Sequence, residues 1–70
     1  MYIVTELQTN GETTAVLNYT YTDKNTALQQ YHTILAAAAV SQVEVHTAYI
    51  VNELGLVEYR ESFDRRTDET

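Results

Sequence analysis

The sequence predicts an α+β protein with the order ββαββ: one four-stranded antiparallel sheet with a single helix on one face, completed by oligomerisation. Four segments are rich in β-branched and aromatic residues, and a stretch between the second and third segments has helical periodicity. Each of the two glycines stands between paired strand segments. We expect one domain over residues 1–63 and a polar, frayed tail over residues 64–70.

The first two strands are expected over Tyr2–Gln8 and Thr13–Tyr21, with Asn10-Gly11 as a two-residue turn, because both residues accept positive φ. This turn places Thr9 opposite Glu12. One face then holds Tyr2, Val4, Glu6, Ala15, Leu17 and Tyr19, and the other holds Ile3, Thr5, Leu7, Thr14, Val16 and Asn18. Both faces are partly apolar. A longer turn would change this register.

A helix is expected from Lys24 to Ala39, with Thr22 or Asp23 as its N-cap. A stripe at helical spacing forms its core-facing side: Ala27, Leu28, Tyr31, Ile34, Leu35 and Ala38. The helix ends on four consecutive alanines, residues 36–39. Three explanations stay open for them: high helix propensity, close approach of another backbone or helix, and space for a ligand.

The last two strands are expected over Val43–Asn52 and Leu56–Phe63. The segment Asn52-Glu53-Leu54-Gly55 predicts a type I turn with its glycine in the left-handed conformation. Alternation in the fourth strand places Val57, Tyr59, Glu61 and Phe63 on one face, and Leu56, Glu58, Arg60 and Ser62 on the other.

Self-association is expected because the chain is short and its sheet is apolar on both faces. Seventy residues bury a limited fraction of their surface, and the sequence has no cysteine for a disulfide. One helix covers about 10 Å of a sheet that is about 19 Å wide, so part of the sheet lacks a second layer. A second copy of the chain would supply that layer.

The composition excludes several classes of function. The net charge of −6 disfavours nucleic-acid polymers and membranes as partners, and the absence of cysteine agrees with a cytoplasmic location. Two histidines without a close spacing predict no metal site, and the two glycines leave no phosphate-binding loop. We therefore expect no metal and no cofactor.

No catalytic arrangement is predicted, so the protein is expected not to be an enzyme. Ser41 and Ser62 have no motif around them that would activate a hydroxyl. His32 is expected at the edge of the apolar stripe, and His46 at a solvated or interface position. A nucleotide-cleaving activity with one of these histidines as the base is a minor alternative.

Tyrosine is frequent, with six in 70 residues, and three arginines lie near the C-terminal end. Tyrosine rings pack well in strands and also stack on planar ligands such as nucleobases. Arginines balance nearby carboxylates or bind phosphates. The ligand site predicted from these groups contains Tyr2, Tyr19, Tyr31, His32, Tyr49, Tyr59, Arg60, Arg65 and Arg66.

Two stretches, MYIVTELQTN and YHTILAAAAVS, carry a resemblance to known sequences. With them and with Glu58-Tyr59, the chain from Met1 to about Tyr59 resembles a group of short hypothetical proteins from phages and prophages of gut Firmicutes. The resemblance implies a phage setting inside an infected bacterial cell, and the first turn of that group is often longer. In style the chain also looks similar to phage anti-defence proteins that sequester nucleotide immune signals.

The function predicted is that of a phage accessory protein: a homo-oligomer that sequesters a nucleotide-derived immune signal at subunit interfaces. Two alternatives stay open. One is a protein-interaction module that inhibits a host enzyme through its acidic residues or by adding a strand at a sheet edge. The other is a small virion-associated structural protein.

Overall fold

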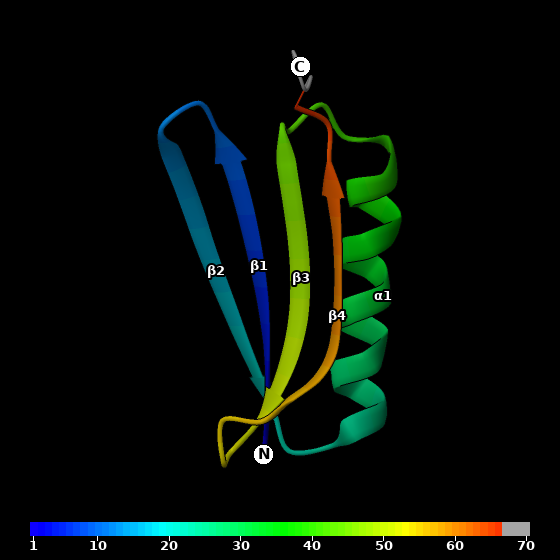
Figure 1. Cartoon of the computed structure of the whole chain (residues 1–70). Helices are drawn as coiled ribbons and strands as arrows, with labels where there is room; N and C mark the ends of the chain where they lie inside the picture. Colours follow the sequence, from blue (N-terminus) through cyan, green and yellow to red (C-terminus); the bar gives the residue numbers. More distant parts are fainter. Residues whose placement is uncertain (67–70) are drawn as a thin grey trace.

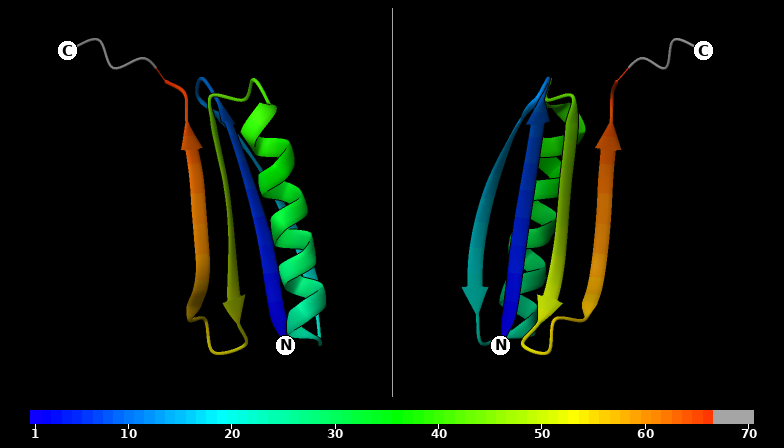
Figure 2. Two further views of the ribbon diagram at one scale, coloured as in Figure 1. Left: turned by 90° about the vertical axis from the view of Figure 1, so that its right-hand side faces the viewer. Right: turned by 60° about the vertical axis from the view of Figure 1, so that its left-hand side comes forward.

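The computed structural model describes residues 1–66. Its elements are β1 (Tyr2–Asn10), β2 (Thr13–Tyr21), α1 (Lys24–Val40), β3 (Val45–Asn52) and β4 (Val57–Asp64). The four strands form one antiparallel sheet in the order β2-β1-β3-β4, and α1 lies across one face of it (Figures 1 and 2). The predicted class and element order are confirmed.

The first hairpin turns one residue later than the sequence predicts. Asn10 lies opposite Thr13, so the turn residues are Gly11 and Glu12. Gly11 has a φ of +61°, and no residue other than glycine has a positive φ among residues 1–66. A type II′ turn needs a glycine with positive φ at its first central position, and Gly11 meets this requirement. The predicted Asn10-Gly11 turn was therefore wrong.

A tertiary contact explains this choice of turn. The Asn10 side-chain oxygen accepts a hydrogen bond from the Glu44 N–H at 3.1 Å, and the Gly11 N–H donates to Glu44 Oε1 at 2.8 Å. The register shifts by two residues, so Val4 lies opposite Tyr19 instead of Leu17. Because side chains alternate with a period of two, the shift leaves the predicted face assignments of this hairpin intact.

The helix follows its sequence signals closely. Asp23 is the N-cap: its Oδ2 accepts hydrogen bonds from the Thr26 N–H and hydroxyl, both at 2.9 Å. The predicted core stripe is confirmed, with Ala27, Tyr31, Ile34 and Ala38 buried and Leu28 and Leu35 partly buried against the core. Within residues 1–66, no helix combines the length and apolarity that crossing a membrane requires.

The core lies between α1 and the two central strands, β1 and β3, because the helix packs mainly against them. Val4 and Ile50 are opposite each other on these strands, and both are almost fully buried. Ala48 is buried beside them, and its small side chain lets the helix approach the sheet closely. The outer strands receive less cover from the helix, so their side chains are more exposed.

The second hairpin contains the predicted turn and an unpredicted bulge. Gly55 has a φ of +83°, and its N–H donates to the Asn52 carbonyl at 2.9 Å. Next to this turn the register of β3 and β4 shifts: Ile50 pairs with Tyr59, whereas Val51 pairs with Val57. The bulge places Val57 beside Val51 on the face away from the helix. The prediction that Val57 shares a face with Tyr59 was therefore wrong.

The chain stays in contact with the domain beyond residue 63. Asp64 is the last residue of β4, and the Arg65 N–H donates to the Glu44 carbonyl at 2.6 Å. The Arg65 guanidinium also donates to the Ala38 carbonyl at the alanine-rich end of α1, and to the Val43 carbonyl at 3.3 Å. Asp64 and Arg65 of the predicted tail thus contact the domain, and residues 67–70 lie outside the described residues.

The alanine run has one buried member. Ala38 is fully buried, whereas Ala36, Ala37 and Ala39 are exposed. The small Ala38 side chain brings the helix end close to the sheet, and its carbonyl accepts from both Arg65 and the Ser41 N–H. Close approach therefore accounts for Ala38, and helix propensity accounts for the exposed alanines.

Candidate ligand-binding face

The sheet face opposite α1 is covered by no element of the described chain, and we call it the open face (right view of Figure 2). From β2 to β4, four cross-strand rows make it up: Thr20, Ile3, Val51 and Val57; Asn18, Thr5, Tyr49 and Arg60; Val16, Leu7, Thr47 and Ser62; Thr14, Thr9, Val45 and Asp64. The face is thus a mixture of aliphatic side chains, hydroxyls, one amide, one aromatic ring and the charged side chains of Arg60 and Asp64.

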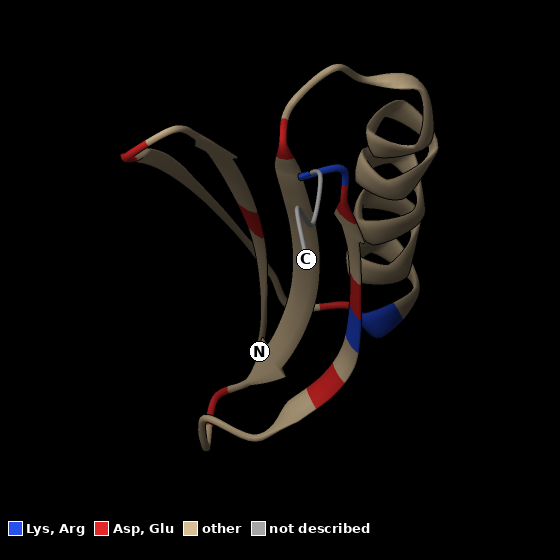
Figure 3. Ribbon diagram, turned by 45° about the horizontal axis from the view of Figure 1, so that its top comes forward, with Lys and Arg blue, Asp and Glu red and all other residues tan. Residues whose placement is uncertain are grey.

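Acidic side chains are almost absent from the open face. Residues 1–66 contain eight of them, and Asp64 alone has a place in the four rows. The others lie at turns and at helix and strand ends (Figure 3), or, for Glu6 and Glu61, in a cross-strand row on the helix side of the sheet. The Asp64 carboxylate is itself neutralised by Arg66 at 2.9 Å. A chain of strongly negative net charge therefore presents one nearly neutral surface.

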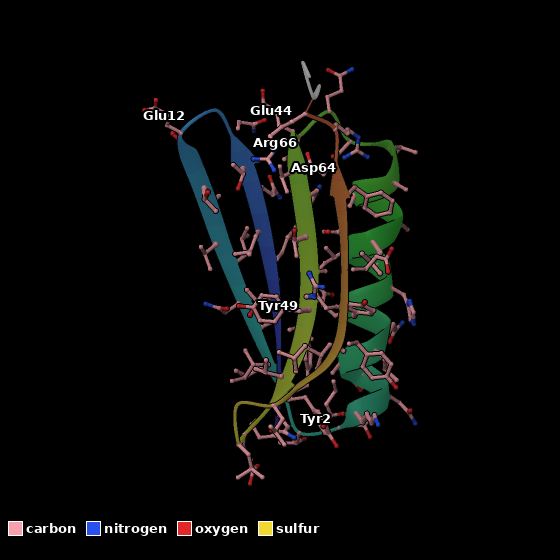
Figure 4. The ribbon with its side chains drawn as sticks, viewed as in Figure 1. Tyr2, Glu12, Glu44, Tyr49, Asp64 and Arg66 are labelled. Carbon is pink, nitrogen blue, oxygen red and sulfur yellow. The ribbon has the colours of Figure 1, made fainter. Side chains whose placement is uncertain are left out.

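The second of these rows joins an aromatic ring to a cation. Tyr49 on β3 is directly opposite Arg60 on β4, and Thr5 on β1 is its neighbour on the other side (Figure 4 labels Tyr49). The Thr5 hydroxyl donates to Asn18 Oδ1 at 2.8 Å, which extends the polar part of the row to β2. Directly opposite side chains have Cβ atoms about 5 Å apart, so the ring and the guanidinium can contact one ligand.

Arg60 differs from the other lysine and arginine side chains in having no ion pair or hydrogen bond among residues 1–66. Lys24 Nζ is 3.6 Å from Glu58 Oε1 and 5.7 Å from the centre of the Tyr59 ring. Arg65 donates to two backbone carbonyls, and its guanidinium carbon is 5.5 Å from the centre of the Phe63 ring. Arg60 makes no ion pair or hydrogen bond with any of the described side chains.

Arg66 forms an ion pair with Asp64 (Figure 4). Its Nε and Nη2 donate to the two carboxylate oxygens at 3.0 and 2.9 Å. These hydrogen bonds lower the pKa of Asp64 to about 2 and raise the pKa of Arg66. Arg65 and Arg66 therefore already have partners within the chain, and the structure does not bring them to Arg60.

Most of the predicted tyrosines lie on the helix side of the sheet. Tyr2 and Tyr19 are partly buried against the core, and Tyr31 is buried within it. Burial raises the pKa of the Tyr31 hydroxyl above its ordinary value. The Tyr31 ring centre lies 5.9 Å from that of Tyr59 and 5.3 Å from that of His32. These rings pack against one another, so packing accounts for them without a ligand.

A chain of hydrogen bonds crosses the sheet near the end of α1. His46 Nε2 is 2.6 Å from Glu6 Oε2, and His46 Nδ1 is 3.1 Å from Ser41 Oγ. Gln8 Nε2 donates to the same Glu6 oxygen at 2.8 Å. His46 is only 3 % exposed, so the prediction of a solvated or interface position was wrong. We call Gln8, Glu6, His46 and Ser41 the buried polar network.

This network was missed because its members are far apart in sequence and meet only after strand pairing. Glu6 and His46 lie on neighbouring strands, two residues apart in register, because His46 pairs with Gln8. The one available signal was Glu6 itself, a carboxylate on the same predicted face as Tyr2 and Val4. A carboxylate in such a position needs a hydrogen-bonding partner, and a histidine on the adjacent strand is well suited to supply it.

Ser41, His46 and Glu6 are linked by hydrogen bonds in the order serine–histidine–carboxylate, as in a hydrolase triad. Their surroundings nevertheless favour a structural role. Ser41 is the C-cap of α1, where the helix dipole is negative and would oppose an oxyanion. The Ser41 N–H donates to the Ala38 carbonyl, and Ser41 Oγ accepts from the Val43 N–H at 3.3 Å. The network thus ties the helix end to the sheet.

The nine residues of the predicted ligand site therefore fall into three groups. The helix side holds Tyr2, Tyr19, Tyr31, His32 and Tyr59; the open face holds Tyr49 and Arg60; and the end of the chain holds Arg65 and Arg66. One copy of the chain brings together Tyr49 and Arg60 on a surface open to a ligand. No protein-family model, curated protein or solved structure compared with the chain matches it.

Proposed function

We propose that the protein binds a nucleotide-type anion on its open face and retains it without chemical change. The base stacks on Tyr49, and the phosphate pairs with Arg60. The single observation that carries this proposal is the position of Arg60. It is the one lysine or arginine side chain of residues 1–66 without an ion pair or hydrogen bond, and it lies opposite an aromatic ring.

The two groups suit such a ligand chemically. A guanidinium presents its N–H donors in a planar fork that matches two phosphate oxygens. Stacking of a base on an aromatic side chain contributes about 1–3 kcal/mol and tolerates any base. Asn18 continues the row with an exposed amide that can bond to a sugar or to a base edge, and the buried Thr5 hydroxyl donates to this amide.

The charge distribution supports the same face. An anion approaching a protein of net charge −6 is repelled over most of the surface. Repulsion is weakest where carboxylates are few, and the open face has only Asp64, which is paired with Arg66. Compared with the hypothesis drawn from the sequence, the proposed site keeps Tyr49 and Arg60 and requires no contribution from a second subunit.

Sequestration of a signalling nucleotide is the biological role we propose, because the sequence resembles short phage proteins. The test is calorimetric titration with mononucleotides, cyclic dinucleotides and ADP-ribose derivatives. Binding of at least one member is expected, and Tyr49→Ala and Arg60→Gln should each weaken it about tenfold or more. Arg66→Gln is the matched control, because it removes the same charge from a guanidinium already paired with Asp64.

The ligand should also be recovered unchanged after prolonged incubation with the protein. Absence of binding by every member at about 0.1 mM would refute the proposal. Equal losses in the Arg60 and Arg66 variants would show that only net charge matters, which would also refute it.

A further inference from the structure

The two edges of the sheet differ sharply in how they are protected. The β4 edge carries charges at Glu58, Arg60, Glu61 and Asp64, and a bulge interrupts its pairing. Charges and bulges are the usual devices that prevent a sheet edge from pairing with another chain. The β2 edge has neither: its nine residues, TTAVLNYTY, contain no charge, glycine or proline, and their register with β1 is unbroken (Figure 3).

The hydrogen-bonding groups of this edge are unused within the described chain. The residues that flank a two-residue turn form a hydrogen-bonded pair, and Asn10 and Thr13 flank the first turn. Alternate residues from Thr13 onward therefore bond to β1. The N–H and C=O groups of Thr14, Val16, Asn18 and Thr20 point away from the sheet.

We infer that β2 pairs antiparallel with β2 of a second copy, about a two-fold axis perpendicular to the sheet. Such an axis keeps the two helices on the same face of the joined sheet. Paired residues must therefore be both odd-numbered or both even-numbered. The register that pairs all nine residues places Leu17 opposite Leu17 of the second copy. The outward groups then form about eight inter-chain hydrogen bonds, two for each outward residue of one copy.

This register also matches the side chains on both faces. On the helix side, Leu17, which is 37 % exposed in one copy, packs on its own equivalent, and Ala15 leaves room for the larger Tyr19 of the second copy. On the open face, Val16 meets Asn18 and Thr14 meets Thr20. Each of these combinations is compatible with cross-strand packing, and hydroxyl pairs are favourable.

Charge identifies a second copy as the occupant. Two chains of net charge −6 repel each other unless they meet where carboxylates are missing. The β2 edge is uncharged along its whole length, so an identical chain can approach it. A basic peptide, by contrast, would find no carboxylate on this strand to pair with.

The inference goes beyond the proposed function and does not depend on it. Tyr49 and Arg60 lie on β3 and β4, the two strands farthest from the β2 edge. The dimer therefore leaves the candidate ligand site open in each copy. If no ligand bound, the expected mass of the dimer would be unchanged. If the protein were monomeric, the proposed ligand site would still be present.

The test compares two lysine substitutions at opposite ends of one cross-strand row. Val16 and Ser62 both lie on the open face, on the β2 and β4 edges respectively. Val16→Lys and Ser62→Lys change the net charge equally, and both positions are exposed, so both variants should fold. Light scattering and sedimentation over a concentration series give the mass, with circular dichroism to verify folding.

We expect the unaltered chain to have twice the single-chain mass of 8.0 kDa, and Ser62→Lys to behave in the same way. Val16→Lys should raise the dimer dissociation constant about tenfold or more, because lysine on an edge strand opposes pairing. A single-chain mass for the unaltered protein at every concentration would overturn the inference. The inference would also be overturned if only Ser62→Lys lost the dimer, if both variants lost it, or if neither variant lost it.

Amide hydrogen exchange on the unaltered chain gives an answer that needs no variant. In the dimer, the outward amides of Val16 and Asn18 exchange at least about tenfold more slowly at high protein concentration than at low concentration. Exchange of these amides that is fast and independent of concentration would contradict β2 pairing.

Discussion

The buried polar network makes a prediction whose size follows from its geometry. The His46–Glu6 contact is 2.6 Å long, and both residues are at most 9 % exposed. Glu6 Oε2 accepts from both Gln8 and His46 Nε2, because an ionised carboxylate can only accept hydrogen bonds. A buried hydrogen bond to a carboxylate contributes about 1.5–3 kcal/mol.

A double-mutant cycle isolates this contribution. Glu6→Met and His46→Phe each keep the shape of the side chain and leave the other partner unsatisfied, so each should lower the free energy of unfolding by about 1–3 kcal/mol. The double variant leaves neither partner unsatisfied, so it should cost less than the sum of the two, by about 1.5–3 kcal/mol. Urea denaturation followed by circular dichroism measures all four corners of the cycle.

An additive result, within about 0.5 kcal/mol, would show that the two residues do not interact and would refute the reasoning. Ser41→Ala offers a further check on the structural role of the network. It removes one hydrogen bond from His46 and should cost about 1 kcal/mol.

Three further predictions test the helix and the core. Asp23→Ala removes the acceptor of two hydrogen bonds from Thr26 and should lower the free energy of unfolding by about 1 kcal/mol in urea. Ala38→Leu overfills a fully buried position and should cost about 1–3 kcal/mol, whereas the exposed Ala37→Leu should change the same quantity by less than about 0.5 kcal/mol; equal effects would contradict the packing described. The folded-state pKa of Tyr31 is raised, so its contribution to stability is complete below its unfolded pKa and is lost as the pH rises through the folded value; Tyr31→Phe should therefore reduce the fall in melting temperature above about pH 10, and an unchanged fall would contradict this.

The class and order of elements were predictable because their signals are local. The two turns are marked by glycines that do adopt positive φ, and the helix by a cap and a stripe within a single segment. What failed were features decided by contacts across the chain. The first turn moved by one residue because Glu44 bonds to both Asn10 and Gly11, more than 30 residues earlier in the sequence.

The bulge in β4 has a similar origin. Glu58 is the extra residue, and its carboxylate accepts from the Asn52 side chain at 3.1 Å and is 3.6 Å from Lys24 at the start of the helix. These contacts hold Glu58 toward the helix side, although alternation predicts the other face. Nothing in the local sequence of the strand indicates that exception.

The candidate site was predictable only in part, because composition indicates ring and charge types but not their neighbours. Tyr31 and Tyr49 look alike in sequence, yet Tyr31 is buried on the sheet-facing side of α1 and Tyr49 is on the open face. The arginines were equally hard to separate: Arg66 follows its carboxylate by two residues, while Arg60 is paired across strands with a tyrosine. Strand register, fixed only by the whole sheet, makes the distinction.

Net charge alone would not require the arrangement of carboxylates found here. Acidic residues keep a small protein soluble wherever they lie on its surface, and an exposed sheet face is as good a place as a turn. Yet β2 has none and the open face has one, which Arg66 neutralises. Because the uncharged β2 edge and the carboxylate-poor open face differ in kind, they suit different partners. An edge offers backbone hydrogen bonds to another strand, and a face offers side chains to a ligand.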